Sequence, residues 1–266
     1  MRTASVLTAS LLLLSVTAIS SPMGAQRRER DDSRWLDKCS DDGWGDRGER
    51  FCEVRDVPLS GTPSRLHVDG GENGGVTVIG WDQSTVRVRA RIEAHAPSES
   101  EARSLARDVR ISTDGTIRAE GPDRGRRSRW SVSYIIYAPR RMDLDLETSN
   151  GGIGIEDVEG SMRLRATNGG ISLDGTAGDV RAETKNGGIH VNLDGSRWRG
   201  TGLDARTSNG GVEVFVPKGY SAQLETGTVN GGFTTDFPIT VQGRLTHRLS
   251  ITLGNGGSPV RAVTTN

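Results

Sequence analysis

Residues 146–155, which read LETSNGGIGI, contain the pattern that decides the fold. Residues 164–173, 182–191 and 205–214 repeat it as LRATNGGISL, AETKNGGIHV and ARTSNGGVEV. The tripeptide Asn-Gly-Gly occurs seven times, and from Asn150 onward its copies begin 18, 18, 23, 21 and 25 residues apart. A repeat of about 20 residues is typical of a solenoid, in which each repeat is one turn that cannot bury its own apolar face.

Apolar and polar residues alternate on both sides of each asparagine. The inward positions are Leu146, Leu164, Ala182 and Ala205 before it, and Ile153, Ile155, Ile171, Leu173, Ile189, Val191, Val212, Val214, Phe233 and Thr235 after it. A period of two predicts strands with one buried face and excludes helix. We therefore predict an all-β fold: a parallel β-helix-like solenoid of about six coils over residues 143–266.

One outward position supports stacking of the coils in register. The residues directly after the inward Leu and Ala positions read Glu147, Arg165, Glu183, Arg206 and, allowing a two-residue insertion, Glu225. If coils stack about 4.8 Å apart, each of these charges would have an opposite charge on both sides. Turn chemistry does not require such alternation, so the column is independent support for the predicted register.

The asparagines are predicted to form structural turns. Asn150, Asn168, Asn186, Asn209 and Asn230 each open a corner where Asn-Gly-Gly supplies residues that tolerate positive φ. Stacked asparagine side chains can also hydrogen-bond to one another as a ladder along the solenoid axis. A phosphate-binding glycine loop would need a strand-to-helix context and typically a single copy, which does not fit this pattern.

Residues 61–142 are predicted to be a less regular β part, continuous with the solenoid and carrying one short helix. Residues 86–92 alternate as a strand, and Ser98 with Glu101 matches a capping box at the start of a helix that extends to Val109. Residues 113–116, Thr-Asp-Gly-Thr, predict a hairpin turn, and residues 130–137 predict another strand.

The N-terminus predicts export. Arg2, an apolar run over residues 6–19 and small residues up to Ala25 have the layout of a secretory signal peptide over residues 1–25. The run is shorter than the roughly 20 residues that a membrane-spanning helix needs. We expect an extracytoplasmic protein, in the periplasm, at the cell surface or secreted, with no transmembrane span in the mature chain.

Residues 26–60 form a charged segment, with 15 charges in the 25 positions from 26 to 50. Such a segment cannot bury enough apolar surface to order itself alone. Cys39 and Cys52 are the two cysteines of the chain, and in an oxidising compartment they are most simply read as a disulfide bond that staples this segment. A redox pair would normally be spaced Cys-x-x-Cys, and a zinc site would need further ligands.

Composition and motifs argue against several functions. The 34 basic and 34 acidic residues give no net charge, so nucleic acid is not an expected partner. No cofactor or metal is expected either, because the four histidines show no ligand spacing and the Gly-x-Ser-x-Gly motif does not occur. A β-helical carbohydrate-active enzyme stays an alternative, because one outward column contains Glu156 and Asp174, followed by Asn192, Phe215 and Asp236.

A binding surface is the preferred interpretation. The repeat after Asn186 is lengthened by residues 196–200, and insertions in solenoids often emerge on the contacting face. The candidate ligand-binding residues are Arg197, Trp198 and Arg199 in this insertion, with Phe215 and Tyr220 in the next coil. In the alternative interpretation, Trp198 folds back and covers the solenoid edge. An envelope polysaccharide or protein is the expected partner, and the exposed solenoid ends could also support self-association.

The order of these features resembles a known family. The strand near Val86, the helix over residues 98–109, the strand Tyr-Ile-Ile-Tyr-Ala-Pro at 134–139 and the repeats from Leu146 are similar to the bacterial putative-adhesin family of domains of unknown function, over residues 64–257. Many relatives have Gly-Ser-Gly-Asp or similar where this chain has Asn-Gly-Gly. The resemblance implies an exported β-solenoid of the cell envelope and no established catalytic residues. The leading hypothesis is therefore a non-enzymatic adhesin or structural interaction module, with an enzyme and a self-assembling envelope scaffold as alternatives.

Overall fold

The computed structural model describes residue 35 and residues 48–123, 125, 127–228 and 248–266. The chain forms two compact units, Met1–Gly43 and Trp44–Asn266, and all the strands and helix α2 belong to the second. The predicted signal peptide, Cys39, and residues Asn230, Phe233, Thr235 and Asp236 lie outside the described residues. The disulfide bond between Cys39 and Cys52 therefore stays a prediction.

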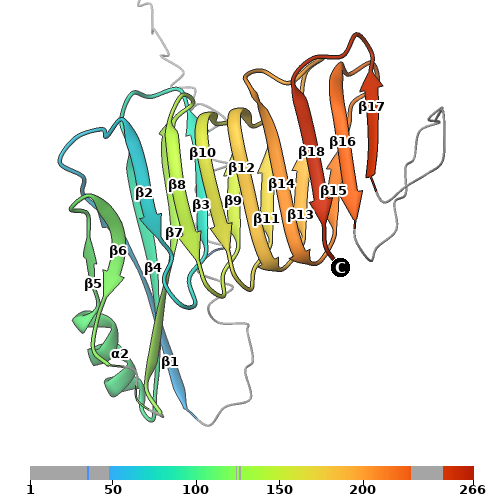
Figure 1. Ribbon diagram of the computed structural model, residues 1–266. Coiled ribbons are helices and arrows are strands. Elements are labelled where there is room, and N and C mark those ends of the chain that lie inside the picture. Colours follow the sequence, from blue (N-terminus) through green and yellow to red (C-terminus); the bar gives the residue numbers. More distant parts are fainter. Residues whose placement is uncertain (1–34, 36–47, 124, 126, 229–247) are drawn as a thin grey trace, which may run out of the picture. The chain divides into compact units, whose positions relative to one another are not determined.

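The second unit is built from two β-sheets that face each other (Figure 1). Sheet A contains, in spatial order, β1 (Glu49–Val57), β4 (Arg87–Ala96), β7 (Arg129–Pro139), β3 (Val76–Trp81), β9 (Ile153–Glu156), β11 (Ile171–Asp174), β13 (Ile189–Asn192) and β15 (Val212–Phe215). Sheet B contains β17 (Arg248–Leu253), β16 (Ala222–Thr228), β18 (Pro259–Thr264), β14 (Gly202–Asn209), β12 (Ala177–Asn186), β10 (Glu159–Ala166), β8 (Asp143–Thr148), β2 (Arg65–Asp69), β6 (Thr116–Glu120) and β5 (Arg110–Ser112).

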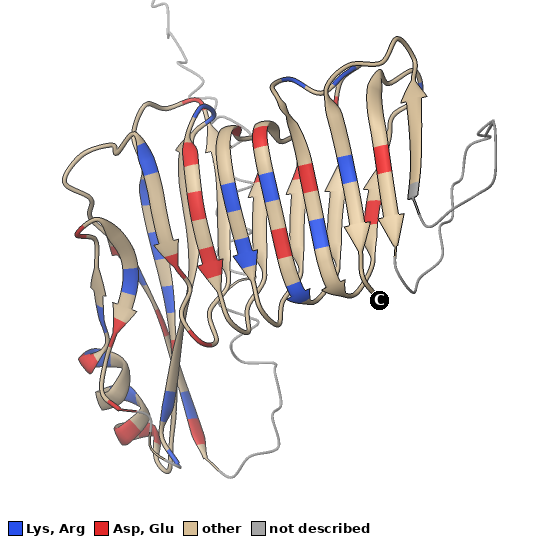
Figure 2. Ribbon diagram, in the orientation of Figure 1, with Lys and Arg blue, Asp and Glu red and all other residues tan. Residues whose placement is uncertain are grey.

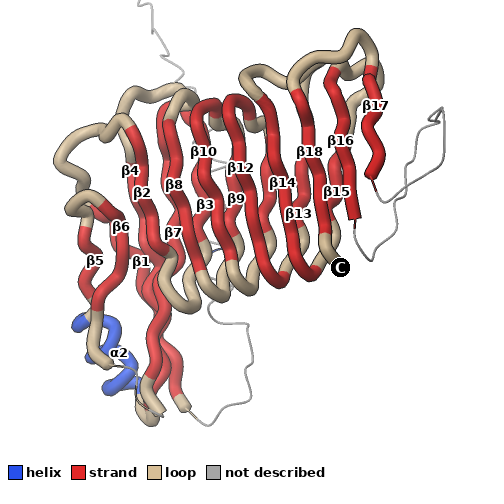
Figure 3. The backbone as a smooth tube through the Cα atoms, in the orientation of Figure 1, coloured by secondary structure: helices blue, strands red, loops and turns tan. Residues whose placement is uncertain are grey.

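The predicted solenoid is confirmed in the repeats. From β8 to β15 the chain alternates between the sheets, and each strand pairs in parallel with the strand one coil later, with short loops between them (Figure 3). Ile153 is in register with Ile171, and Ile171 with Ile189. The inward side chains of both sheets meet in one apolar core in which Leu164, Leu173 and Val191 are fully buried. The alternation read from the sequence thus sets both the strand type and the register.

The glycines at the asparagine corner are required by close approach of neighbouring coils. A Cβ atom built on Gly151 would lie 2.1 Å from the carbonyl oxygen of Gly74, and one on Gly169 would lie 1.9 Å from that of Gly151. These distances are too short for any side chain. The expectation that Asn-Gly-Gly supplies positive φ is wrong for the copies at Asn150, Asn168 and Asn186, because none of their residues has positive φ. Gly175, in the opposite corner, does have one, at 59°.

The corner asparagines form a ladder of side-chain amides. Nδ2 of Asn168 donates to Oδ1 of Asn150 at 2.7 Å, and the same bond joins Asn150 to Asn73, Asn186 to Asn168 and Asn209 to Asn186. Just inside the ladder, Thr148, Thr184 and Thr207 are buried and donate their hydroxyls to glycine carbonyl oxygens of the same corner. Side-chain hydrogen bonds therefore satisfy polar groups at a corner that has no room for carbon side chains.

The N-terminal part contains one complete coil before the long insertion. Strands β2 and β3 pair in parallel with β8 and β9, so the copy of the tripeptide at Asn73 is a true repeat. The insertion adds β4 and β7 to sheet A, β5 and β6 to sheet B, and helix α2 (Glu99–Asp108). As predicted, the Ser98 side chain caps this helix by accepting from the backbone N–H of Glu101.

Residues 49–57, in the second half of the predicted charged segment, are ordered by pairing with another strand. They form β1 and pair antiparallel with all of β4 except its first residue. Arg55 of this strand donates to the carbonyl oxygens of Ala106 and Val109 at the end of α2, at 2.8 and 2.6 Å. A cation at a helix C-terminus is favourable, so one charged residue of the segment anchors strand and helix together.

The C-terminus also departs from simple repetition. Strand β18 lies between β14 and β16 and pairs in parallel with both. Arg206 is consequently next to Val263, and the predicted continuation of its column to Glu225 is wrong. Glu225 pairs instead with Arg261 on β18. The last residue, Asn266, donates to Oδ1 of Asn209 and extends the asparagine ladder by one member that the repeat alignment did not identify.

Candidate functional site

The insertion at residues 196–200 does not present its tryptophan to solvent. The Trp198 side chain is 5% exposed, packs in the apolar core, and donates its indole N–H to the carbonyl oxygen of Gly178 at 3.0 Å. Of the two interpretations of Trp198, this geometry corresponds to a ring that covers the solenoid edge. Trp198 is therefore withdrawn from the candidate contact residues, because its ring cannot reach a ligand without leaving the core.

The other four candidates do not form one surface. Tyr220 is buried, and burial raises the pKa of its hydroxyl to about 12. Arg199 is held by ion pairs to Asp194 at 3.4 Å and to Glu159 at 3.7 Å. Arg197 is exposed, and among the described residues Phe215 is a large apolar side chain with an exposed fraction of 58%. Because Tyr220 is buried like Trp198, it is also excluded as a ligand-contacting residue.

The acidic pair considered for catalysis lies on the outer face of sheet A. Glu156 of β9 and Asp174 of β11 are direct neighbours in register, and the next residues in the column are Asn192 and Phe215, as the sequence indicates. Both carboxylates are exposed. The third acid, Asp236, lies outside the described residues, so two acids on one strand face are all that the structure brings together for such chemistry.

The outer face of sheet B carries a much denser set of charges (Figure 2). The predicted column Glu147, Arg165, Glu183 and Arg206 is in register across β8, β10, β12 and β14. Arg165 is within 3.0 Å of Glu147 and within 3.3 Å of Asp145. The coils therefore stack so that acids and bases of neighbouring strands alternate along this column.

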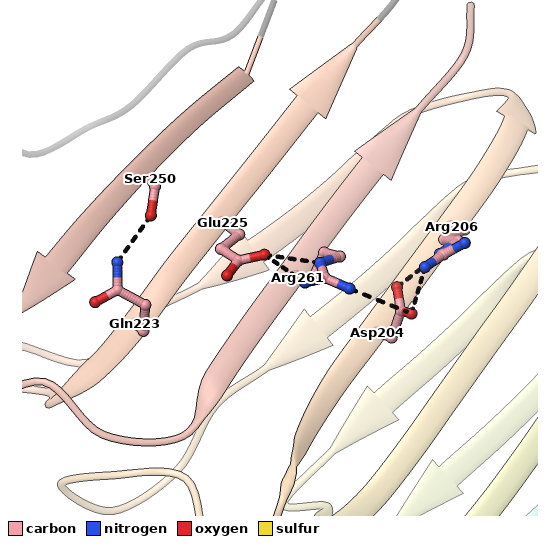
Figure 4. Close-up of polar contacts among 6 residues, drawn as sticks. All are labelled: Asp204, Arg206, Gln223, Glu225, Ser250 and Arg261. Carbon is pink, nitrogen blue, oxygen red and sulfur yellow. Dashed lines mark hydrogen bonds and ion pairs between the residues drawn. The ribbon is translucent and has the colours of Figure 1, made fainter.

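A second ion-pair chain crosses the C-terminal strands of the same face (Figure 4). Arg261 of β18 lies between Glu225 of β16, at 2.6 Å, and Asp204 of β14, at 4.0 Å. Asp204 in turn binds Arg206, whose pKa is raised above its ordinary value by these hydrogen bonds. On the far side of β16, Gln223 donates to Ser250 of β17. The inserted strand β18 is thus joined electrostatically to both of its neighbours.

A groove of about 970 Å³ runs along sheet B beside the asparagine corner. It crosses β2, β8, β10, β12, β14 and β18, so it is about 24 Å long for strands about 4.8 Å apart. One side is lined by the column that contains Glu147 and Arg206, and the other by Ser149, Thr167, Lys185, Ser208 and Thr265. The groove offers hydroxyls and charges of both signs over several coils, which suits an extended polar chain better than a compact small molecule.

Sequence reasoning identified one wall of this groove and missed the other. The repeats predict the charged column as a device for register, and the predicted candidate residues do not include the hydroxyl-rich column. Its signal is present in four of the repeats, because the residues directly before Asn150, Asn168, Asn186 and Asn209 are Ser149, Thr167, Lys185 and Ser208. Aligning that position across the repeats would have shown a second outward column of polar side chains.

The described residues contain neither a cluster of metal ligands nor a membrane-spanning helix. No group of three or more His, Cys, Asp or Glu side chains in the part of the chain that the structure describes could hold a metal ion. In the same residues, no helix has both the length and the apolar character needed to cross a membrane.

Residues 139–266 match the model of the family described as Toastrack DUF4097. Two solved structures are similar to the chain. One is described as "a putative cell adhesion protein" from Clostridium sporogenes, with 12% identity, a TM-score of 0.38, and coverage of 82% of this chain and 94% of that one. The other is described as "a putative adhesin" from Parabacteroides merdae, with 11% identity, a TM-score of 0.36, and coverage of 62% and 72%. No curated protein matches the chain in sequence.

Proposed function

We propose, from the match of residues 139–266 to the Toastrack DUF4097 family, that this protein is an exported, non-catalytic interaction module of the bacterial cell envelope. The family match bears out the resemblance drawn from the repeats, over the part of the chain that holds them. In this proposal the repeats act as a rigid support, and the protein binds an extended envelope polysaccharide along the outer face of sheet B.

The groove beside the asparagine corner is the observation that carries the polysaccharide-binding part of this proposal. Most of its lining comes from β-strands of stacked coils, which are more precise supports for a site than loops. Its residues recur from coil to coil in register, so the groove presents alternating acids and arginines beside a column of mostly hydroxyl-bearing residues. A polymer of repeating units can use such a surface several times over, and many weak contacts then add to a useful affinity.

Blocking the groove tests the proposal. Ser208 is an exposed residue of the groove wall, and Ser172 is an exposed residue on the outer face of sheet A. We expect Ser208→Trp to weaken retention of the protein on immobilised envelope polysaccharides by about tenfold, because one large ring obstructs a continuous polymer path. The matched variant Ser172→Trp should bind like the wild type. Equal loss in both variants, or in neither, would contradict a site on sheet B.

The absence of catalysis and the export of the chain need tests of their own. Incubation of the purified protein with the same polysaccharides should release no shorter fragments. Cleavage that disappears in Asp174→Asn would overturn the non-catalytic part of the proposal and support the acidic pair on sheet A. For export, mass spectrometry of the mature protein should find a chain that begins at Gln26. A cytoplasmic, uncleaved chain would remove the envelope from the proposal.

A further inference from the structure

The charge pattern of sheet B has one irregularity, at the fifth residue before each asparagine. This column reads Asp145, Arg163, Arg181 and Asp204 across β8, β10, β12 and β14. Arg163 and Arg181 are therefore direct neighbours in register on adjacent strands. Like charges placed directly opposite each other destabilise a sheet, and the column two residues further along each strand avoids this by alternating.

The two acids next to this arginine pair in the column, Asp145 and Asp204, form ion pairs with other side chains. Asp145 lies 3.3 Å from Arg165 and 3.8 Å from His67. Asp204 binds Arg206 and is also approached by Arg261. Among the residues that the structure describes, neither Arg163 nor Arg181 forms an ion pair or a side-chain hydrogen bond, and both are exposed. Arg163 and Arg181 thus lie in register on adjacent strands without an ion pair to a described residue, although Asp145 and Asp204 flank them in the same column.

The pair borders a small cavity of about 200 Å³ on the outer face of sheet B. Besides Arg163 and Arg181, its lining includes Arg65 and the hydroxyl-bearing Ser161. Arg65 is itself paired with Asp143 at 3.1 Å. Two carboxylates, those of Asp145 and Asp179, also border the cavity, and Asp179 forms no ion pair with any described residue. An entering anion would therefore meet Arg163 and Arg181 without ion pairs, and it would also face the carboxylates of Asp179 and of Asp145, which is already paired with Arg165.

We propose that Arg163 and Arg181 together bind an oxyanion group, a carboxylate or sulfate, carried by an acidic polysaccharide that lies in the neighbouring groove. This inference rests on the proposed function, since it names the class of polymer. Arg163 precedes the groove residue Arg165 by two positions on β10, which is about 6.6 Å along a strand. A substituent on a chain in the groove can reach that far, and the planar guanidinium matches an oxyanion with two parallel hydrogen bonds.

Binding of such an oxyanion would offset the repulsion between Arg163 and Arg181. A bound anion between the arginines would replace their repulsion with two charge-assisted contacts, and the parallel pairing of β10 with β12 fixes the backbone positions from which both side chains extend. Asp179 weakens the site for any anion, and removing its charge should strengthen binding. Arg163→Gln/Arg181→Gln and Asp179→Asn therefore have opposite expected effects on the same measurement.

The experiment compares binding of the full chain to polygalacturonate, to dextran sulfate and to neutral dextran in low salt. We expect the acidic polymers to be preferred, the Arg163→Gln/Arg181→Gln variant to bind them about tenfold more weakly, and Asp179→Asn to bind them a few-fold more tightly. The charge-matched control is Arg110→Gln/Arg118→Gln, which alters two exposed arginines on β5 and β6 and should leave binding unchanged. Free sulfate should compete only at concentrations far above those of the polymer's charged groups, because it lacks the groove contacts.

The outcomes separate this inference from the proposed function. Equal binding of neutral and acidic polymers, or an unchanged affinity in Arg163→Gln/Arg181→Gln, would overturn the oxyanion site and leave the groove as a polymer site. An equal loss in the Arg110→Gln/Arg118→Gln control would overturn it too, because the effect would then follow net charge alone. Failure of the wild type to bind any of the three polymers would overturn both.

Discussion

The two sheets of the repeats have the same inner face and different outer faces. Inward, Leu164 of sheet B and Leu173 of sheet A are equally buried, and both belong to one core. Outward, β9, β11, β13 and β15 carry no lysine or arginine, whereas β8, β10, β12 and β14 carry acids and arginines in register. Because stacking of coils requires only the inner pattern, the outer residues are free to differ. The difference between the two outer faces is therefore the part of the sequence that bears on function.

The largest effect should come from the face that the sheets share. We expect Leu164→Ala and Leu173→Ala to lower the free energy of unfolding by similar amounts, about 3 kcal/mol each, because each removes a fully buried side chain and leaves a cavity in the same core. Urea denaturation of both variants would measure this. A small loss for one leucine alone would show that the two inner faces are not equivalent.

A smaller effect should distinguish the corner from the outer face of sheet A. Gly169→Ala should cost about 2 kcal/mol, since its Cβ would lie 1.9 Å from the carbonyl oxygen of Gly151 and the coils would have to move apart. Gly154→Ala is the matched control, because its Cβ would have only an ordinary contact, 3.4 Å from the Thr77 hydroxyl. Thermal unfolding should show a clear decrease for the first variant and almost none for the second. A larger decrease in unfolding temperature for Gly154→Ala than for Gly169→Ala would contradict close stacking at the asparagine corner.

The smallest effect should come from the ion pairs of sheet B. Arg165 is 43% exposed, so its pairs with Asp145 and Glu147 are screened by solvent. We expect Arg165→Gln to lower the free energy of unfolding by about 0.5 kcal/mol in low salt and by less in high salt. Denaturation at two ionic strengths would measure both values. A loss as large as that of Leu164→Ala would mean that the charges of sheet B serve stability rather than binding.

The sequence predicted those features that repeat. The inward columns and the outward column from Glu147 to Arg206 follow from a constant spacing, and the structure reproduces them. The helix at residues 99–108 followed from a local cap and an apolar period. These are signals that a single chain carries within a short window.

The features that the sequence did not predict depend on contacts between distant segments. Insertion of β18 between β14 and β16 depends on pairing with strands far earlier in the chain, and no local period marks it. For Trp198 the sequence indicated both an exposed and a buried position, and the carbonyl oxygen of Gly178, 20 residues away, favours the buried one by accepting its indole N–H. Glycine is favoured both where neighbouring coils approach closely and where the backbone needs a positive φ. The sequence therefore could not show which of the two applies at the asparagine corner.

The central claim is that sheet B, and not sheet A, presents the binding face, and carboxylate footprinting tests it most directly. Exposed acids would be labelled with a carbodiimide and an amine, with and without bound polymer, and quantified by mass spectrometry. Glu147 and Glu183 report on sheet B, and Asp174 and Glu213 report on sheet A. The account predicts that polymer protects the first pair and leaves the second pair unchanged. Protection of Asp174 and Glu213, with Glu147 and Glu183 still labelled, would contradict it.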